Sequence, residues 1–497
     1  MAKYILSIDQ GTTSCRAIVF SAGGEVVGLG QEEFRQYFPH SGWVEHDANE
    51  ILEKQVKCIK DAVDKAKVDP SEIACVGLTN QRETTVVWDK STGEPICPAI
   101  VWQCRRTAEM VEEMIGLSAA SGAKIGDIIR EKTGLIADAY FSGTKICWIL
   151  NNIPGARTLA QAGKLAFGTI DSWLVYKLTE EARHVTEPSN ASRTMLFDIS
   201  KIAWDDELLA GMDVPRSMMP EVIASNDVFG HTRKDLLGFR APLLAVLGDQ
   251  QAALFGQVCF EPGMFKCTYG TGSFLLGNIG KSKTLVNGLL TTIAWKLRKQ
   301  EPIYALEGAS FMGGATIQWL RDQLGLISAS DQAEELAKSL DTNGGVYLVP
   351  GHVGLGSPWW NPHVRGTIVG LSRDSGKAHI VRAGLEAIAY QIEDIAHEIN
   401  LAGIQMKELK ADGGASKNNW LMQFQADLLK VPIKRGAQTE ATAWGVAMLA
   451  GMMIDLIDSN SIARNTVKST DFYPAKDRQA DYEQWRKAVG AAIAFSQ

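Results

Sequence analysis

Alternating apolar and polar positions open the chain. Residues 4–8, 17–20 and 26–30 form three short runs of the strand type. Gly and Thr residues predict a tight turn at residues 10–14, and a second turn falls at residues 22–25. A helical stretch follows at about residues 48–67, and an apolar run at residues 74–78 predicts a buried strand. This β-β-β-α-β order differs from a doubly wound dinucleotide fold, which begins β-α-β.

A similar opening recurs in the second half of the chain. Residues 264–268 and 273–277 predict two strands joined by a tight turn at residues 269–272, and isoleucines at helical spacing predict a helix over residues 380–399. The two turns indicate duplicated halves that meet at a cleft. Because 497 residues are too many for one hydrophobic core, we expect two domains. We place them at residues 1–252 and 253–497.

Composition narrows the class of protein. The net charge of −7 and the scattered Lys and Arg residues argue against nucleic acid or an anionic membrane as the main partner. The most apolar window, residues 441–454, is shorter than the roughly 20 residues of a membrane span and predicts a buried helix. The N-terminus lacks the features of a signal peptide, and the eight cysteines show no C-x-x-C spacing. We therefore expect a cytoplasmic protein.

The first turn is a candidate phosphate site. Gly11 allows close approach of a ligand, and the N–H and hydroxyl groups of Thr12, Thr13 and Ser14 form an anion-binding concavity. Asp9, at the end of the first strand, is placed to hold Mg²⁺ through water. The alternative is an ordinary hairpin whose Thr side chains satisfy the turn.

Asp249 is a candidate general base. It follows an apolar run at residues 243–247, and a carboxylate at the end of a strand beside Gly248 can accept the proton of a substrate hydroxyl. The alternative is a helix N-cap, because Asp favours that position.

Other polar and aromatic residues fit a neutral polyol. Arg82 and Glu83 offer a donor fork and an acceptor for two hydroxyls, with a surface ion pair as the alternative. Trp102 and Tyr140 offer flat faces for the C–H side of a polyol, with core packing as the alternative. Gly413 and Gly414 would let a base or ribose lie against the backbone, with Asn418 in hydrogen-bonding range.

Many segments of the chain, in this order, resemble the sugar and polyol kinases of the FGGY family, which belongs with actin, hexokinase and the heat-shock chaperone ATPases. The likeness covers nearly the whole chain. Its carriers are Asp9-Gln-Gly-Thr-Thr-Ser14, Gly42-Trp-Val-Glu-His-Asp47, Asn80-Gln-Arg-Glu-Thr-Thr85, Trp102-Gln-Cys-Arg-Arg-Thr107, Tyr140-Phe-Ser-Gly-Thr-Lys145, Asn190-Ala-Ser-Arg193, Gly248-Asp-Gln-Gln251, Thr268-Tyr-Gly-Thr-Gly-Ser-Phe274, Tyr304-Ala-Leu-Glu-Gly308 and Gln318-Trp-Leu-Arg321.

The resemblance implies an α/β protein with two actin/hexokinase-like (ribonuclease-H-like) domains and a central nucleotide cleft. It implies ATP-dependent phosphorylation of a terminal hydroxyl of glycerol, with another small polyol or sugar as the alternative, and Mg²⁺ as cofactor. Asp249 would be the base. By the same likeness, the substrate-binding residues would be Arg82, Glu83, Trp102, Tyr140, Asp249, Gln250 and Phe274. The nucleotide-binding residues would be Thr12, Thr13, Ser14, Arg16, Thr271, Gly272, Gly314, Gln318, Gly414 and Asn418. We also expect a homo-oligomer, a dimer or a tetramer.

The chain departs from the family pattern at several places, two of which concern packing. Gly384 stands where Ser, Thr or a small apolar residue is usual, which predicts a closer helix contact. Trp359 stands in a Trp-Trp-Asn-Pro segment where Tyr-Trp-Asp-Pro is commoner, and we expect this change to be peripheral.

Overall fold

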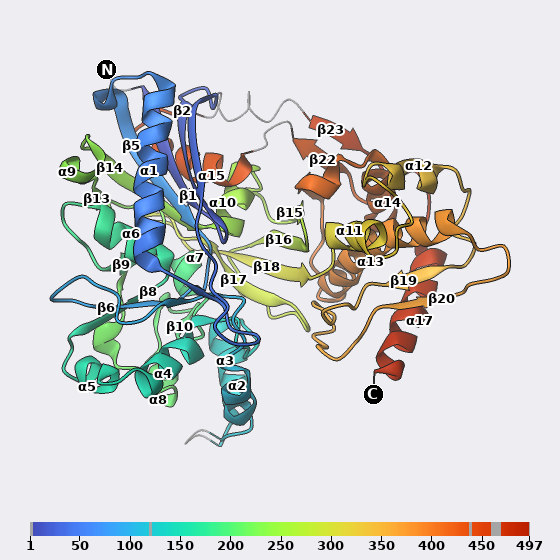
Figure 1. Cartoon of the computed structure of the whole chain (residues 1–497), viewed down its shortest axis with the longest axis horizontal. Coiled ribbons are helices and arrows are strands. Elements are labelled where there is room, and N and C mark those ends of the chain that lie inside the picture. The colour runs from blue at the N-terminus through green and yellow to red at the C-terminus, as the bar shows by residue number, and fades with distance from the viewer. Residues whose placement is uncertain (1–2, 119–121, 437–439, 459–468, 497) are drawn as a thin grey trace.

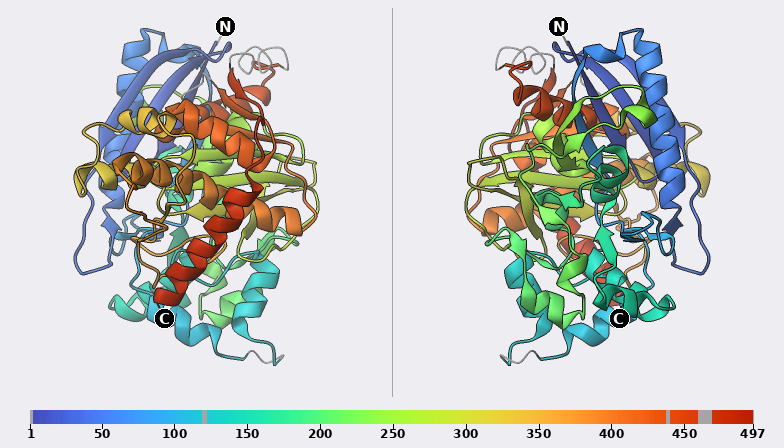
Figure 2. Two further views of the ribbon diagram at one scale, coloured as in Figure 1. Left: turned by 90° about the vertical axis from the view of Figure 1, so that its right-hand side faces the viewer. Right: turned by 90° about the vertical axis from the view of Figure 1, so that its left-hand side faces the viewer.

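The computed structural model describes residues 3–118, 122–436, 440–458 and 469–496. The chain forms two halves that lie side by side, each built on a mixed β-sheet (Figure 1). The N-terminus lies on one half and the C-terminal helix α17 (Gln479–Phe495) lies along the outside of the other (Figure 2). Within these ranges no helix is both long and apolar enough to cross a membrane.

The N-terminal sheet has six strands in the described part of the chain, ordered β13-β14-β5-β1-β2-β3. Their bounds are β1 (Tyr4–Gln10), β2 (Ser14–Ser21), β3 (Val26–Glu33), β5 (Ile73–Asn80), β13 (Gly230–His231) and β14 (Pro242–Gly248). Strands β1, β2 and β3 are antiparallel neighbours, whereas β5 runs parallel to β1, and β14 runs parallel to β5. The predicted opening order is confirmed.

The C-terminal sheet has seven strands among the described residues, ordered β17-β18-β16-β15-β21-β22-β23. Their bounds are β15 (Met264–Tyr269), β16 (Ser273–Gly280), β17 (Leu290–Trp295), β18 (Ile303–Ser310), β21 (Glu408–Asp412), β22 (Ile433–Gly436) and β23 (Ser469–Phe472). The antiparallel run β15-β16-β18 and the parallel neighbours β21 and β22 repeat the order and directions of the first sheet. The predicted duplication is therefore confirmed.

Helices cover both faces of the first sheet. Leu6 and Ile8 of β1 pack with α1 (Ala48–Ala66) and α6 (Ile170–Leu178), while Ile5 faces α10 (Asp249–Gly256) and α15 (Ala441–Met452). Helix α15 is the buried helix predicted from the apolar window.

Two glycines let α10 and α15 cross closely. A Cβ on Gly445 would lie 1.9 Å from the carbonyl oxygen of Ala252, and one on Gly256 would lie 2.0 Å from that of Ala441. Because no side chain fits at these two glycines, α10 and α15 pack with their backbones in contact. Helix α10 therefore contacts both the first sheet and α15, which belongs to the C-terminal half.

The second sheet packs one face on α11 (Gly314–Asp322), α13 (Lys377–Leu401), α14 (Asn419–Leu429) and α17. Helix α13 is the predicted long helix. A Cβ on Gly384 would lie 2.6 Å from Cδ1 of Leu320 on α11, which confirms the closer helix contact.

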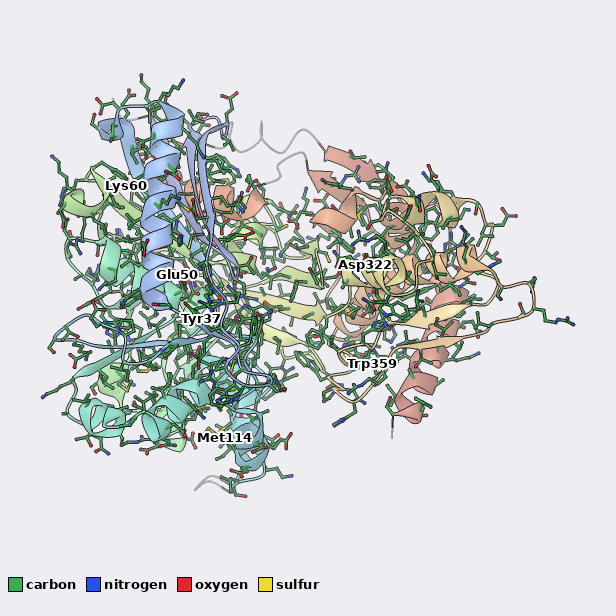
Figure 3. All side chains as sticks on the ribbon, viewed as in Figure 1. Tyr37, Glu50, Lys60, Met114, Asp322 and Trp359 are labelled. Carbon is green, nitrogen blue, oxygen red and sulfur yellow. The ribbon has the colours of Figure 1, made fainter. Side chains whose placement is uncertain are left out.

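Trp359 lies in the C-terminal half (Figure 3). It is partly buried and packs against the hydrophobic core, so the expectation of a peripheral change is wrong. Its indole N–H donates to the buried carboxylate of Asp394 at 3.1 Å, and the same carboxylate accepts from Tyr482 and Trp485 of α17. Trp359 therefore helps to attach the C-terminal helix.

Short elements complete the structure. The small strand pairs are β4 (Glu45–His46) with β7 (Ala99–Ile100), β6 (Val86–Asp89) with β8 (Leu165–Gly168), β9 (Val185–Thr186) with β12 (Glu221–Val222), β10 (Phe197–Asp198) with β11 (Ala203–Trp204), and β19 (Tyr347–Val349) with β20 (Thr367–Val369). The other helices include α2 (Ala108–Ile115), α3 (Ile125–Thr133), α4 (Ser142–Asn152), α5 (Ala156–Gln161), α7 (Pro188–Ala191), α8 (Asp206–Gly211), α9 (Lys234–Leu237) and α12 (Gln332–Lys338).

Candidate active site

The candidate residues gather at the carboxyl edge of the first sheet. Strands β1, β5 and β14 are parallel, and they end at Gln10, Asn80 and Gly248 respectively. Since the carboxyl ends of parallel strands meet at one edge, Asp9, Arg82 and Asp249 come together there.

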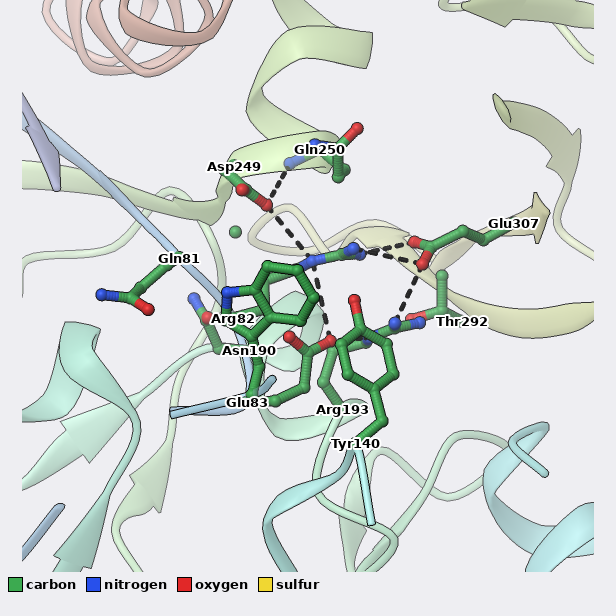
Figure 4. Close-up of polar contacts among 12 residues, drawn as sticks. Gln81, Arg82, Glu83, Tyr140, Asn190, Arg193, Asp249, Gln250, Thr292 and Glu307 are labelled. Atoms are coloured by element: carbon green, nitrogen blue, oxygen red, sulfur yellow. Dashed lines mark hydrogen bonds and ion pairs between the residues drawn. The ribbon is translucent and has the colours of Figure 1, made fainter. Parts of the chain in front are cut away.

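Asp249 is the first residue of α10. The N-cap is Gly248, so the alternative assignment of Asp249 as the cap is wrong. Its carboxylate accepts the backbone N–H of Gln250 at 2.7 Å and lies 3.2 Å from Nε of Arg82 (Figure 4). With 32% of its side chain exposed, Asp249 is fixed in orientation and still reachable by a ligand.

Arg82 and Glu83 are buried, so the surface ion pair is also wrong. The two side chains are 3% and 2% exposed. Glu83 has a φ of 61°, a left-handed backbone that costs a non-glycine residue about 1–3 kcal/mol. A strained, buried carboxylate beside a candidate base is typical of a binding site.

Two charged residues that sequence reasoning left without a role complete this cluster. Glu307 of β18 accepts from Nη1 of Arg82 at 2.5 Å and from Nη2 of Arg193 at 2.9 Å, and Nε of Arg193 donates to Glu83 at 2.6 Å (Figure 4). Although burial opposes it, the guanidiniums of Arg193 and Arg82 lower the pKa of Glu307 to about 2. The available signal was a single charged residue in an otherwise uncharged, buried strand, since a buried carboxylate needs a partner.

The aromatic candidates lie beside this cluster. The rings of Trp102 and Tyr140 are 5.5 Å apart and nearly perpendicular, and Nε1 of Trp102 donates to Oγ1 of Thr12 at 3.0 Å. Burial raises the pKa of the Tyr140 phenol, so it stays a hydrogen-bond donor. Trp102 thus connects the polyol candidates to the first turn.

Phe274 reaches the same region from the second sheet. It pairs with Ala309 on β18, two positions from the pair formed by Leu276 and Glu307. Because alternate positions of a strand share a face, Phe274 and Glu307 lie on the same side of the sheet.

Gln250 contacts a buried lysine. Its Oε1 accepts from Nζ of Lys266, which also donates to Oγ1 of Thr268 at 3.0 Å. Burial lowers the pKa of Lys266. This pair joins the first turn of α10 to β15, and sequence reasoning did not assign Lys266.

Side-chain amides support the first turn from behind. Nε2 of Gln36 donates to the carbonyl oxygen of Thr12 at 3.1 Å, and Nε2 of Gln81 donates to that of Gly11 at 3.2 Å. The turn itself is closed by the N–H of Gly11 and the carbonyl oxygen of Ser14 at 2.9 Å. In these hydrogen bonds the acceptors are carbonyl oxygens of the turn. Other N–H and hydroxyl groups of the turn are therefore left to bind an anion.

Carboxylates crowd the end of β1. Arg16 lies between Asp9, at 3.6 Å, and Glu440, to which its Nη2 donates. Burial, only partly offset by Arg16, raises the pKa of Asp9 to about 6, and the carboxylates of Asp249 and Glu440 add to the rise.

Three glycine-bearing segments meet at the carboxyl edge of the second sheet. The N–H of Gly313 donates to the carbonyl oxygen of Thr271 at 2.8 Å, and that of Gly314 donates to Gly270 at 2.8 Å. Gly413 has a φ of 88°, and a Cβ there would lie 2.6 Å from the carbonyl oxygen of Tyr269. The structure therefore brings Thr271, Gly272, Gly314 and Gly414 together.

Gln318 and Asn418 flank this group of turns. Gln318 is exposed one helical turn after Gly314 on α11. Asn418 caps α14, with its Oδ1 accepting the N–H of Leu421 at 2.9 Å. Because the cap uses the side-chain oxygen of Asn418, its Nδ2 is the atom that could donate a hydrogen bond to a ligand.

Comparison with known proteins gives the family. Residues 4–256 match the N-terminal domain of the FGGY family of carbohydrate kinases, and residues 265–454 match its C-terminal domain. The chain belongs to the FGGY family of carbohydrate kinases. The resemblance drawn from the motifs and the predicted fold class are thereby confirmed.

Relatives within the FGGY family share the full length of the chain. A glycerol kinase of Thermococcus onnurineus is 50% identical over 100% of this chain and 99% of its own length. A glycerol kinase of Deinococcus radiodurans is 51% identical over 99% of this chain and 97% of its own. The crystal structure of Plasmodium falciparum glycerol kinase with ADP is 33% identical, with a TM-score of 0.93 over 99% of this chain and 98% of that one.

Proposed function

We propose that this FGGY kinase transfers the γ-phosphoryl group of ATP to a terminal hydroxyl of glycerol, giving sn-glycerol 3-phosphate and ADP. Full-length relatives named glycerol kinase support this activity. The observation that carries it for this chain is the position of Asp249, at the carboxyl edge of the first sheet and 3.2 Å from Arg82. A phosphotransferase with an alcohol acceptor needs a base placed in this way.

Glycerol would occupy the buried cluster. Arg82, Glu83, Tyr140 and Gln250 hydrogen-bond its hydroxyls, while Trp102 and Phe274 flank its carbons. Because Arg193 binds Oε1 of Glu83, we assign Oε2 to a substrate hydroxyl. A neutral triol suits this site because the cluster's charges pair with one another and the substrate brings none.

The chemical step follows from this placement. Asp249 accepts the proton of the terminal hydroxyl, whose oxygen bonds to the γ-phosphorus. The bond from that phosphorus to the β,γ-bridging oxygen breaks, and ADP leaves with the electron pair. Alignment of this kind lowers a barrier by about 7–11 kcal/mol, and a positioned base adds about 10²–10⁴-fold.

The nucleotide would lie across both sets of turns. Thr12, Thr13, Ser14 and Arg16 from the first half and Thr271 and Gly272 from the second hold the phosphates. Gly314, Gln318, Gly414 and Asn418 line the nucleoside. The proposed domains, residues 1–252 and 253–497, divide within α10, whose first residue is the base.

Asp9 would hold Mg²⁺ through water. Among the described residues, no group of three or more His, Cys, Asp or Glu side chains is arranged as a metal site. One buried carboxylate with a raised pKa and two carboxylate neighbours fits a cation that takes few protein ligands and completes its shell with water and phosphate oxygens. When bound, Mg²⁺ neutralises phosphate charge.

We also propose a cytoplasmic enzyme that assembles as a dimer or tetramer. All eight cysteines are free thiols, as expected in a reducing compartment. Light scattering of the purified chain measures the assembly state, and a monomer at micromolar concentration would contradict the second part.

The activity is tested by ADP release from ATP with glycerol, other polyols, xylulose and gluconate as acceptors. We expect glycerol to give the highest kcat/KM, with the phosphate on a terminal carbon by ³¹P and ¹³C NMR. A higher kcat/KM with another polyol or sugar would favour the alternative, a different acceptor on the same fold. The absence of acceptor-dependent turnover would refute the proposal.

A further inference from the structure

The acceptor cluster is built from both halves of the chain. Arg82 and Glu83 follow β5, and Arg193 follows α7, all in the N-terminal half. Glu307 comes from β18 of the second sheet, and its carboxylate points at both arginines (Figure 4). Direct ion pairs thus join Glu307 to Arg82 and to Arg193, which lie 225 and 114 residues away in the sequence.

Glu307 uses both carboxylate oxygens. Its Oε2 lies 2.5 Å from Nη1 of Arg82, while Oε1 accepts from Nη2 of Arg82 at 3.1 Å and from Nη2 of Arg193 at 2.9 Å. A fork-to-fork pair of this kind fixes the plane of a guanidinium. With its two terminal nitrogens held, Arg82 turns Nε toward Asp249.

Arg193 links Glu307 to Glu83. It is fully buried between Glu307 and Glu83, and its guanidinium lies 5.5 Å from the ring centre of Tyr140 and 5.1 Å from that of Phe141. Two arginines this close would repel each other in a buried site without a carboxylate between them. Glu307 supplies that charge.

We propose that Glu307 is a positioning residue of the acceptor site, which holds Arg82 and Arg193 and through them sets the orientation of Asp249 and Glu83. This inference rests on the proposed function. Both carboxylate oxygens of Glu307 bind arginines, so Glu307 acts through them. The acceptor site therefore contains residues of both halves, because Glu307 lies on the second sheet and binds two arginines of the N-terminal half.

The substitution Glu307→Gln tests this role with little change in shape. The amide keeps one acceptor oxygen but presents N–H groups to the N–H groups of an arginine. Arg82 loses one of its fork contacts and turns toward Asp249, the nearer of its two remaining carboxylate partners, at 3.2 Å against 3.8 Å for Glu83. Misplacement of a reacting group by about 1 Å costs about 10²-fold in rate.

The experiment uses the full chain and four proteins: wild type, Glu307→Gln, Glu307→Asp and Glu386→Gln. Glu386 is the matched control because it forms a buried ion pair with Arg382 at 2.8 Å, with both side chains 3% exposed, away from the acceptor cluster. The measurements are kcat, KM for glycerol, the pH profile of kcat/KM and the affinity for ADP by calorimetry.

We expect Glu307→Gln to lose about 10²-fold in kcat/KM for glycerol and to displace the acid limb of its pH profile, because the Arg82 guanidinium then lies closer to Asp249. ADP affinity should stay within twofold of wild type. Glu307→Asp should recover part of the rate and the wild-type profile. Glu386→Gln should leave all four quantities unchanged.

An unchanged kcat/KM and pH profile in Glu307→Gln would overturn the inference. An equal loss of ADP affinity would also overturn it, since that indicates general damage to the fold. A wild type without glycerol-dependent turnover would instead refute the proposed function, so the two failures are distinct.

Discussion

Replacing Asp249 with Asn removes the proposed base and keeps its geometry. An Asn side chain has one oxygen, which can still accept the N–H of Gln250, at 2.7 Å in the native chain, and face Nε of Arg82, at 3.2 Å. The side chain is one third exposed, so the lost ion pair costs stability only about 1 kcal/mol or less. The fold and the nucleotide turns should therefore persist.

The catalytic loss follows from the role of a positioned base. We expect kcat to fall about 10²–10⁴-fold, or about 3–5 kcal/mol of barrier, at saturating glycerol and ATP. ADP release reports kcat, and calorimetry with ADP should give wild-type affinity. Asp481→Asn is the control, because Asp481 pairs with Arg478 at 3.1 Å on the outer helix α17. A kcat within threefold of wild type would remove Asp249 from the mechanism.

Four further predictions follow from other contacts. Tyr140→Phe keeps the ring near Arg193 but loses the phenol hydroxyl, so KM for glycerol should rise about tenfold while KM for ATP stays constant. Equal changes in both KM values would count against Tyr140 as a glycerol-binding residue. Glu307 has a folded pKa of about 2, below the ordinary 4.5, so its contribution of about 3 kcal/mol is present above pH 4.5 and is lost as the pH falls to 2. Urea midpoints should drop less over this range in Glu307→Gln than in wild type, and equal drops would contradict the shift. Trp359→Phe removes the indole donor to Asp394 and should lower the free energy of unfolding by about 1–3 kcal/mol with unchanged kcat. An unchanged melting temperature would show that this hydrogen bond does not stabilise the fold. Asp9→Asn should raise the Mg²⁺ concentration needed for half-maximal turnover about tenfold, and an unchanged requirement would place the metal elsewhere.

The sequence predicted most of the fold because its signals were local. Alternation gave the strands that became β1, β2 and β3, and helical periodicity gave α13. Strand order and the crossing of α10 with α15 depend on contacts between distant residues, which no local pattern encodes.

The site was predictable where a motif carried it. Arg82, Tyr140 and Asp249 are close together as their likeness to the family implies. Glu307 and Arg193 received no role because their partners are more than 100 residues away, and a charged residue by itself does not name its counter-ion. Burial also decided between alternatives that the sequence left open, since Arg82 and Glu83 lie inside the protein.

A crystal structure of the full chain with glycerol and a non-hydrolysable ATP analogue measures the central arrangement directly. We expect a terminal hydroxyl oxygen at about 2.6–3.2 Å from the Asp249 carboxylate, with the γ-phosphorus on the opposite side of that oxygen. A ternary structure with the triol bound elsewhere, or with Asp249 turned away from the acceptor oxygen and another side chain in its place, would contradict the account.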